Sequence, residues 1–141
     1  MPIEDGDVIV AARGSSTDVC TASEGIFGAY ISLDLYLVRP QPKRINSEYL
    51  QAVLELPATQ AALASEKQGS GLARLPKDAL EKIEIPLPPL HQQRLIAGLA
   101  LSLEDEHKLL KKLGELKDRL GREVLGRAIR GTKTNFSRRS A

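Results

Sequence analysis

Two stretches of the chain carry the hydrophobic patterns of β-strands. Residues 8–12 (Val-Ile-Val-Ala-Ala) are apolar on both faces, which predicts a short strand buried on both sides. Residues 26–38 alternate with a period of two, which predicts a longer strand with one buried face. The apolar face of that strand would carry Ile31, Leu33, Leu35 and Leu37, and the polar face Tyr30, Ser32, Asp34 and Tyr36.

The middle of the chain has the cap and periodicity signals of two helices. Asn46 or Ser47 can cap a helix over Glu48–Leu56, because their side chains accept hydrogen bonds from first-turn N–H groups. Pro57 suits the first turn of a second helix that reaches about Lys67. The first helix has an apolar stripe made of Tyr49, Leu50, Val53 and Leu54.

The pattern changes sharply in the last third of the chain. Ile83–Leu87 alternates like a strand, but Pro86, Pro88 and Pro89 fix φ and remove N–H donors. A strand there would lie at a sheet edge and stop at the prolines. From about Leu90 the period becomes helical, with apolar residues at alternating steps of three and four. The predicted coiled-coil seam comprises Ile96, Leu99, Leu103, Glu106, Leu110, Leu113, Lys117, Leu120 and Val124.

Glycines indicate that this long helix is not stable alone. Gly98, Gly114, Gly121 and Gly126 each cost about 1 kcal/mol relative to alanine. The sequence offers no second helix of matching length, so we expect the helix to pair with a second copy or another subunit. The patterns together predict an α+β fold, a small mixed α/β domain followed by a long C-terminal coiled-coil helix. The expected boundaries are residues 1–88 for the domain, 89–127 for the helix and 128–141 for a basic, disordered tail.

Composition restricts the classes of function. The 141-residue chain has a net charge of +2, but residues 125–141 hold five basic and no acidic side chains, which leaves 15 basic and 18 acidic ones in residues 1–124. A nucleic-acid site on the domain must therefore be a local patch. Cys20 is the single cysteine; we expect a buried, inert thiol and a reducing cytoplasm. We find no signal peptide and no stretch long enough to span a membrane.

The sequence lacks signatures of catalysis. His91 and His107 have no carboxylate or cysteine neighbours at ligand spacing, so we expect no metal site. Residues 68–71 form a glycine-bearing loop without the lysine of a phosphate-binding loop, and no Ser-His-Asp or Cys-His set is placed for nucleophilic work. The sequence therefore predicts a protein that is not an enzyme and needs no cofactor.

Two polar loops have the side chains that DNA recognition requires. Arginine can bind guanine O6 and N7 together, glutamine can bind adenine N6 and N7, and lysine binds phosphates. The alternative for each loop is an ordinary solvated turn. The candidate DNA-binding residues are Arg13, Ser15, Ser16 and Thr17 in the first loop, and Lys67, Gln68, Ser70 and Arg74 in the second. A third basic cluster, Arg39, Lys43 and Arg44, suits phosphate contact and plain solvation equally.

Several motifs, in a fixed order, give the chain a family resemblance. They are Gly6-Asp7-Val8-Ile9-Val10, Tyr36-Leu37-Val38-Arg39-Pro40, Asn46-Ser47-Glu48-Tyr49-Leu50, the Gly69/Gly71 loop, Ile85-Pro86-Leu87-Pro88-Pro89-Leu90 and Gln92-Gln93. On these motifs the chain resembles the specificity (S) subunit of type I restriction–modification systems over most of residues 4–124. In that family a target-recognition domain reads part of a split DNA sequence, and a long helix spaces it from a second such domain.

The resemblance implies a non-catalytic protein that binds double-stranded DNA and directs methyltransferase (M) and restriction (R) subunits to it. A full subunit has two recognition domains and two spacer helices, whereas this chain has at most one of each. We therefore expect a half-subunit that works as a homodimer through its long helix. The alternatives are a truncated fragment, or a structural docking protein that has lost DNA readout. The expected docking residues are Gln92, Gln93, Ile96, Leu99, Leu103, Leu110, Leu113 and Leu120; for the two glutamines, docking of the helix onto its own domain is a second alternative.

Overall fold

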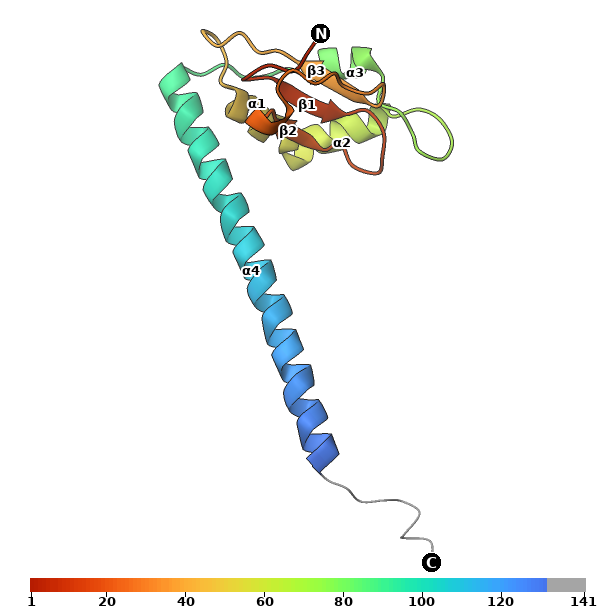
Figure 1. Ribbon diagram of the computed structural model, residues 1–141. Helices are drawn as coiled ribbons and strands as arrows, with labels where there is room; N and C mark the ends of the chain where they lie inside the picture. Colours follow the sequence, from red (N-terminus) through yellow and green to blue (C-terminus); the bar gives the residue numbers. More distant parts are fainter. Residues whose placement is uncertain (132–141) are drawn as a thin grey trace, which may run out of the picture. The chain divides into compact units, whose positions relative to one another are not determined.

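The structure, a computed structural model, describes residues 1–131 as a small sheet with three short helices and one long helix (Figure 1). The predicted α+β class is confirmed. The strands are β1 (Val8–Ala11), β2 (Val19–Thr21) and β3 (Leu35–Val38), and a 3₁₀ turn spans Glu24–Ile26. The helices are α1 (Ser47–Glu55), α2 (Pro57–Glu66), α3 (Lys77–Glu81) and α4 (Leu90–Gly131). Residues 1–100 form one compact unit, and a second unit begins at Leu101 within α4.

β1 is the central strand of the sheet, as its apolar pattern predicts. The strand order is β2-β1-β3, and both pairings are antiparallel. Ile9 lies opposite Cys20 on one side and Leu37 on the other, so Val8 and Val10 share the opposite face. Val8 and Val10 are fully buried and Ile9 is nearly so, which confirms a strand covered on both faces.

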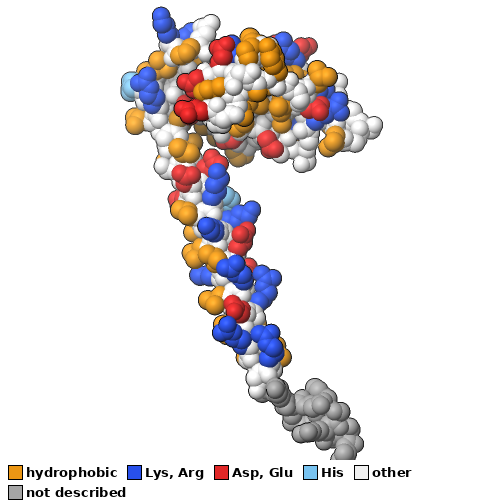
Figure 2. All heavy atoms as spheres, in the orientation of Figure 1, with side chains coloured by type: hydrophobic (Ala, Val, Ile, Leu, Met, Phe, Trp, Pro, Cys, Tyr) orange, Lys and Arg blue, Asp and Glu red, His pale blue; other side chains and the backbone are white. Residues whose placement is uncertain are grey.

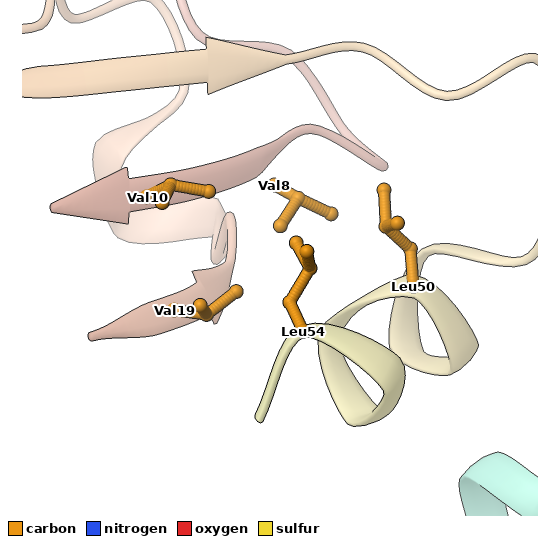
Figure 3. Packing of buried hydrophobic residues seen from close by; sticks show 5 residues of the cluster. All are labelled: Val8, Val10, Val19, Leu50 and Leu54. Atoms are coloured by element: carbon orange, nitrogen blue, oxygen red, sulfur yellow. The ribbon is translucent and has the colours of Figure 1, made fainter. Parts of the chain in front are cut away.

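The main core joins this sheet to α1 (Figure 3). Valines of β1 and β2 face leucines of α1, and burying a side chain of this size contributes roughly 1.5–3 kcal/mol. The buried members are Val8, Val10, Val19, Leu50 and Leu54. The stripe predicted for α1, made of Tyr49, Leu50, Val53 and Leu54, is buried at all four positions and is therefore confirmed.

Local signals set the ends of the short helices. The side chain of Asn46 accepts a hydrogen bond from Tyr49 N at 2.8 Å, which is the predicted N-cap. Pro57 is the first residue of α2, where its missing N–H costs nothing. α2 and α3 share a smaller cluster built on Leu63 and Leu75, both fully buried.

The strand predicted over residues 26–38 is wrong in its length and in the direction of its side chains. Only Leu35–Val38 pairs with β1. Tyr36, which the sequence pattern assigns to the polar face, lies opposite Val10 and packs against the main core. Its hydroxyl donates to the carbonyl oxygen of Leu75 at 2.6 Å, so the polar tip is satisfied inside the fold. Pairing with β1, not the local alternation, decides which face is buried.

The edge strand predicted at residues 83–87 is also wrong. Ile83 and Ile85 pack against the core as the alternation predicts, but the segment has no regular secondary structure. Pro86 and Pro88 lack the N–H groups that a sheet ladder needs. The prolines therefore turn a strand-like pattern into an irregular connection that leads directly into α4.

Cys20 is exposed, so the predicted buried thiol is wrong. It lies in the middle of β2, an edge strand, beside Val19, whose side chain points into the main core. Side chains alternate across a strand, so Cys20 faces away from α1. The argument against an internal disulfide is unaffected, because the chain has one cysteine.

α4 is longer than predicted. It begins one residue later and continues four residues past the predicted end at 127, so its 42 residues extend about 63 Å. Glu123 and Arg127 form an ion pair at 3.1 Å that supports the last turns. Residues 128–131, predicted to begin the disordered tail, are therefore helical, whereas 132–141 lie outside the described residues.

Candidate nucleic-acid interface

Three polar loops meet at one end of the sheet. Because β1 and β3 are antiparallel, the residues after β1 lie beside those before β3, and Asp34 O accepts a backbone hydrogen bond from the end of β1 at 2.8 Å. Arg74, from a third loop, forms β-bridges with both Arg13 and Gln68. The two candidate loops that lie far apart in the sequence thus form one surface. We call residues 13–18, 32–34 and 67–74 the loop cluster.

Asp34 holds two arginines of the loop cluster together. Arg13 Nε lies 2.8 Å from Asp34 Oδ1, and Arg74 Nη1 lies 3.6 Å from the same oxygen. Arg74 Nη2 donates to Leu33 O at 2.9 Å, and the guanidinium lies 5.6 Å from the centre of the Tyr36 ring. All three charged side chains are partly exposed. Pairs of this kind add little stability, but together they set the direction of each guanidinium.

The pattern along the sequence does not indicate this arrangement. Asp34 and Tyr36 fall in the predicted strand, on its polar face, and both are distant in sequence from Arg13 and Arg74. The sequence pattern offers no signal for Asp34 as a site residue, because it reads as one more polar position of a strand whose true start, at Leu35, only the structure shows. Only the antiparallel pairing of β1 with β3 brings it to the arginines.

The other candidate residues differ in whether their side chains are exposed and whether they already bind another part of the protein. Lys67 Nζ donates to Gly14 O at 2.9 Å, which ties two loops of the cluster together. Ser16 Oγ donates to Asp18 Oδ1 at 2.8 Å. The exposed residues among these candidates are Ser15, Ser16, Gln68 and Ser70. These positions keep polar side chains on the solvent side of the loop cluster.

Thr17 does not suit the DNA-binding role predicted for it, because it is buried. It is only 2% exposed, and its backbone N and O both bind the amide of Gln60, at 3.3 and 2.9 Å. Thr17 lies just before β2, where Gln60 of α2 holds its backbone inside the fold. A buried hydroxyl cannot reach a DNA groove, and we remove Thr17 from the candidate set.

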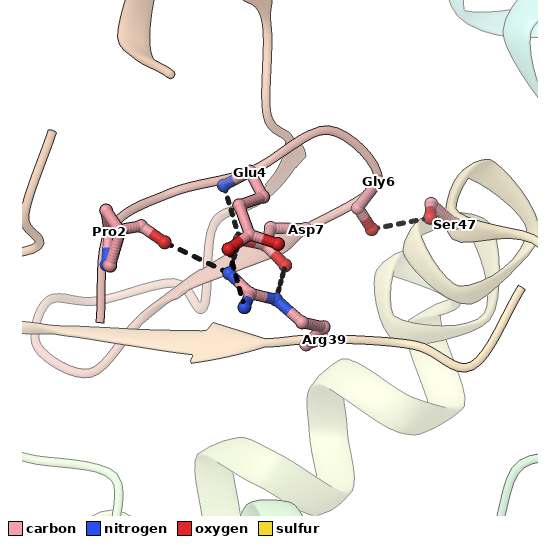
Figure 4. Close-up of polar contacts among 6 residues, drawn as sticks. All are labelled: Pro2, Glu4, Gly6, Asp7, Arg39 and Ser47. Carbon is pink, nitrogen blue, oxygen red and sulfur yellow. Dashed lines mark hydrogen bonds and ion pairs between the residues drawn. The ribbon is translucent and has the colours of Figure 1, made fainter. Parts of the chain in front are cut away.

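Arg39 is part of the scaffold and not a free phosphate ligand. Its Nε and Nη2 bind the two carboxylate oxygens of Asp7 at 2.7 and 2.8 Å, and its Nη1 lies 3.1 Å from Glu4 (Figure 4). Asp7 is fully buried, and the hydrogen bonds from Arg39 lower its pKa. Ser47 Oγ donates to the carbonyl of Gly6 at 2.6 Å, where the φ of +82° is one that glycine adopts easily. These contacts around the buried Asp7 therefore fix the start of β1, the end of β3 and the start of α1.

Replacing Asp7 with asparagine should lower the free energy of unfolding by roughly 2 kcal/mol near neutral pH, because the charged hydrogen bonds with Arg39 are lost. The pKa of Asp7 is lowered from 3.8 in the folded state. The wild type's advantage is therefore complete above about pH 5 and is lost as the pH falls through the lowered folded pKa. Urea unfolding of both proteins between about pH 7 and pH 2 measures this.

The adjacent Asp5→Asn is the matched control, because Asp5 is exposed. It should change the free energy of unfolding by less than about 0.5 kcal/mol. A difference between wild type and Asp7→Asn that stays constant down to about pH 2 would contradict the assignment to this carboxylate.

Gln93 connects the start of α4 to the segment before α1. Its side chain is fully buried; Oε1 accepts from Asn46 N at 2.8 Å, and Nε2 donates to Arg44 O at 3.0 Å and Pro88 O at 2.8 Å. Of the two predicted roles for Gln93, docking of the helix onto its own domain is the one the structure contains. Burial excludes contact between Gln93 and another subunit, whereas Gln92 is exposed.

Known proteins resemble the chain over most of its length. A family model described as the type I restriction modification DNA specificity domain matches residues 1–115. The chain belongs to this family. A curated relative, the type I restriction enzyme MjaVIII specificity subunit of Methanocaldococcus jannaschii, is 28% identical over 129 residues, which are 92% of this chain and 27% of the relative. The chain thus spans about a quarter of the relative's length.

The motifs that carry the family resemblance form the scaffold of this specificity domain. All of them except the Gly69/Gly71 loop, which lies in the loop cluster, bind another motif through side chains, and these contacts explain their fixed order without any contact to DNA. The contacts are Asp7 with Arg39, Ser47 with Gly6, Asn46 with Gln93, and the Tyr49 hydroxyl with Pro86 O at 2.8 Å. Arg13, Asp34 and Arg74 of the loop cluster lie outside these motifs.

The candidate docking residues of α4 in the specificity domain are exposed, apart from Gln93. On the face of α4 that Figure 2 shows, the visible hydrophobic side chains lie mainly along one edge. Ala97 instead packs against Tyr49 and Val53 of α1, so the side of the helix that contacts the domain differs from the seam. The exposed seam residues are Ile96, Leu99, Leu103, Leu110, Leu113, Leu120 and Val124.

Two further observations apply to residues 1–131 of the specificity domain. No helix in that part of the chain combines the length and the apolar character needed to cross a membrane. In the same residues, no three His, Cys, Asp or Glu side chains are grouped as ligands for a metal ion.

Proposed function

We propose that this specificity domain reads part of a DNA sequence with its loop cluster and directs the M and R subunits of a type I restriction–modification system to that sequence. The observation that carries the proposal is the meeting of Arg13, Lys67 and Arg74 at one end of the sheet, in a chain of a DNA specificity family. The guanidinium and amide groups there suit base edges, and the lysine suits phosphate.

The charge of the loop cluster supports local rather than general DNA binding. Arg13, Lys67 and Arg74 are partly balanced by Asp18 and Asp34, while residues 1–124 as a whole are slightly acidic. Affinity for random DNA depends on how many phosphates are neutralised. With few free cations, binding must depend mainly on base contacts, as a recognition domain requires.

We infer that the domain takes no chemical step itself. In the role that the family implies, methylation and cleavage belong to the M and R subunits, and this chain supplies the target. The proposal places the protein in the cytoplasm, with the DNA and those subunits.

We propose further that α4 pairs with a second copy of the chain. The exposed seam repeats at steps of three and four, and a strict seam of this kind is what a two-helix coiled coil buries. Leu109 and Leu116 are also exposed, and they lie directly beside Leu110 and Lys117 of the seam. This wider apolar stripe suits a third helix, which we assign to an M subunit.

Selection from random duplexes tests DNA reading. The purified full chain, alone and with a cognate M subunit, should enrich one sequence pattern, and the quadruple variant Arg13→Ala, Lys67→Ala, Gln68→Ala, Arg74→Ala should enrich none. The matched control Lys77→Ala, Lys82→Ala, Arg94→Ala also removes three positive charges, at exposed positions outside the loop cluster and outside the cluster of Arg39, Lys43 and Arg44. It should keep the wild-type pattern. No enrichment by the wild type in either form would reject the proposal.

A second candidate function is a docking protein that no longer reads DNA. The slight acidity of residues 1–124 favours it. It predicts that the quadruple variant keeps every activity of the assembled complex. Loss of sequence-specific methylation in the quadruple variant, with the control variant active, would reject this candidate.

A further inference from the structure

We infer that Arg13 is the base-reading arginine of the loop cluster, that it reads a guanine, and that Asp34 and Arg74 are positioning residues for it. This inference rests on the proposed function and goes beyond it, because it divides the two arginines into different roles. The division follows from which nitrogen atoms of each guanidinium are already engaged.

Arg13 keeps the end of its guanidinium available. Its Nε binds Asp34 Oδ1 at 2.8 Å, and its side chain is 48% exposed. Among the described residues, no hydrogen bond is found for its two terminal nitrogens. An arginine held through Nε presents Nη1 and Nη2 as a fixed fork, and this fork matches the O6 and N7 acceptors of guanine in the major groove.

Arg74 has no such fork to offer. Its Nη2 donates to Leu33 O at 2.9 Å, its Nη1 lies 3.6 Å from Asp34 Oδ1, and its guanidinium lies over the Tyr36 ring. Both terminal nitrogens therefore already face protein atoms, Leu33 O and Asp34 Oδ1. The planar group is fixed by a carbonyl, a carboxylate and an aromatic ring, which suits a structural role at the back of the loop cluster.

Asp34 is the residue on which the arrangement depends. Its backbone is tied to the end of β1, and one carboxylate oxygen serves both arginines. Without that negative charge the two guanidinium groups would repel each other, and Arg13 would lose its anchor. Asp34 therefore has two effects. It lowers the net positive charge of the loop cluster, which weakens affinity for random DNA, and it fixes the direction of Arg13, which favours selection of one base.

Selection from random duplexes, with the full chain and three single variants, separates these roles. Arg13→Lys keeps the charge but lacks the fork, so it should lose at least about tenfold of the preference for one guanine while the salt dependence of binding stays unchanged. Arg74→Lys should keep the same sequence pattern and weaken the preference at that guanine by only a few fold. Urea unfolding midpoints equal to that of the wild type show that each variant is folded.

Asp34→Asn distinguishes a positioning role of Asp34 from a purely structural one, because the two roles predict opposite changes in affinity for random DNA. Its preference for guanine should fall, while its affinity for random DNA rises and depends more steeply on salt, because one negative charge is gone. A structural defect would instead lower both binding to the selected sequence and binding to random DNA.

The outcomes distinguish this inference from the proposed function. If the wild type enriches a sequence that contains no guanine, or if Arg13→Lys keeps every base preference, the inference is overturned while DNA reading stands. If Arg74→Lys loses the guanine and Arg13→Lys does not, the roles are reversed and the inference is also overturned. If the wild type enriches nothing, the proposed function fails and takes the inference with it.

Discussion

Gln93→Leu should lower the free energy of unfolding of the domain by about 3 kcal/mol. Leucine has a similar size but cannot make the three hydrogen bonds of Gln93, so Asn46 N, Arg44 O and Pro88 O lose their partner. Each buried polar group left unsatisfied costs roughly 1–3 kcal/mol. Urea unfolding followed by circular dichroism measures the change.

Gln92→Leu is the matched control for this experiment. It makes the same substitution at the neighbouring position of α4, where the side chain is exposed. We expect a change of less than about 0.5 kcal/mol. Equal unfolding midpoints for the two variants would show that the buried amide does not hold α4 to the domain.

Leu110→Asp should weaken self-association of the chain by at least about 100-fold. Leu110 lies in the middle of the predicted seam, and in a symmetric pair each copy would bury one carboxylate against apolar side chains. Burial of an unpaired charge is far more costly than the loss of the leucine contacts alone. Sedimentation equilibrium over a range of protein concentrations measures the dissociation constant.

Leu101→Asp provides the control, because Leu101 is 59% exposed and Leu110 is 60% exposed. Leu101 lies outside the three-and-four repeat, so an aspartate there stays in water and the dimer should persist. A wild-type chain that sediments as a monomer would remove the basis for the homodimer. Equal weakening by both substitutions would place the contact on a different face of α4.

The scaffold explains why the sequence reveals the family resemblance but does not reveal which DNA sequence the proposed site would bind. Asp7, Arg39, Asn46 and Gln93 belong to motifs of the resemblance, and all four bind one another's segments inside the domain. Arg13 and Asp34, which we propose set the base preference, lie in loops between those motifs. Loops on a rigid scaffold can change their side chains without changing the fold, so the motifs carry the architecture and, in our proposal, the loops carry the specificity.

Short-range signals in the sequence determine the helices. The Asn46 cap, the position of Pro57 and the buried stripe of α1 depend only on residues within a turn or two, and all were predicted correctly. The same holds for β1, whose apolar residues on both faces require a central place in a sheet. The long helix was predicted for the same reason, since its period is set by neighbours three and four residues apart.

Tertiary structure decides what depends on partners distant in the sequence. Tyr36 faces the core because β3 pairs with β1 in a particular register, and Cys20 is exposed because β2 is an edge strand. The fold also buries Thr17, a candidate DNA-binding residue, and brings Asp34 beside Arg13 and Arg74. Local alternation cannot specify which strand lies opposite which, so the sequence by itself determined the elements and the kinds of side chain available, and only the fold determined which of them meet.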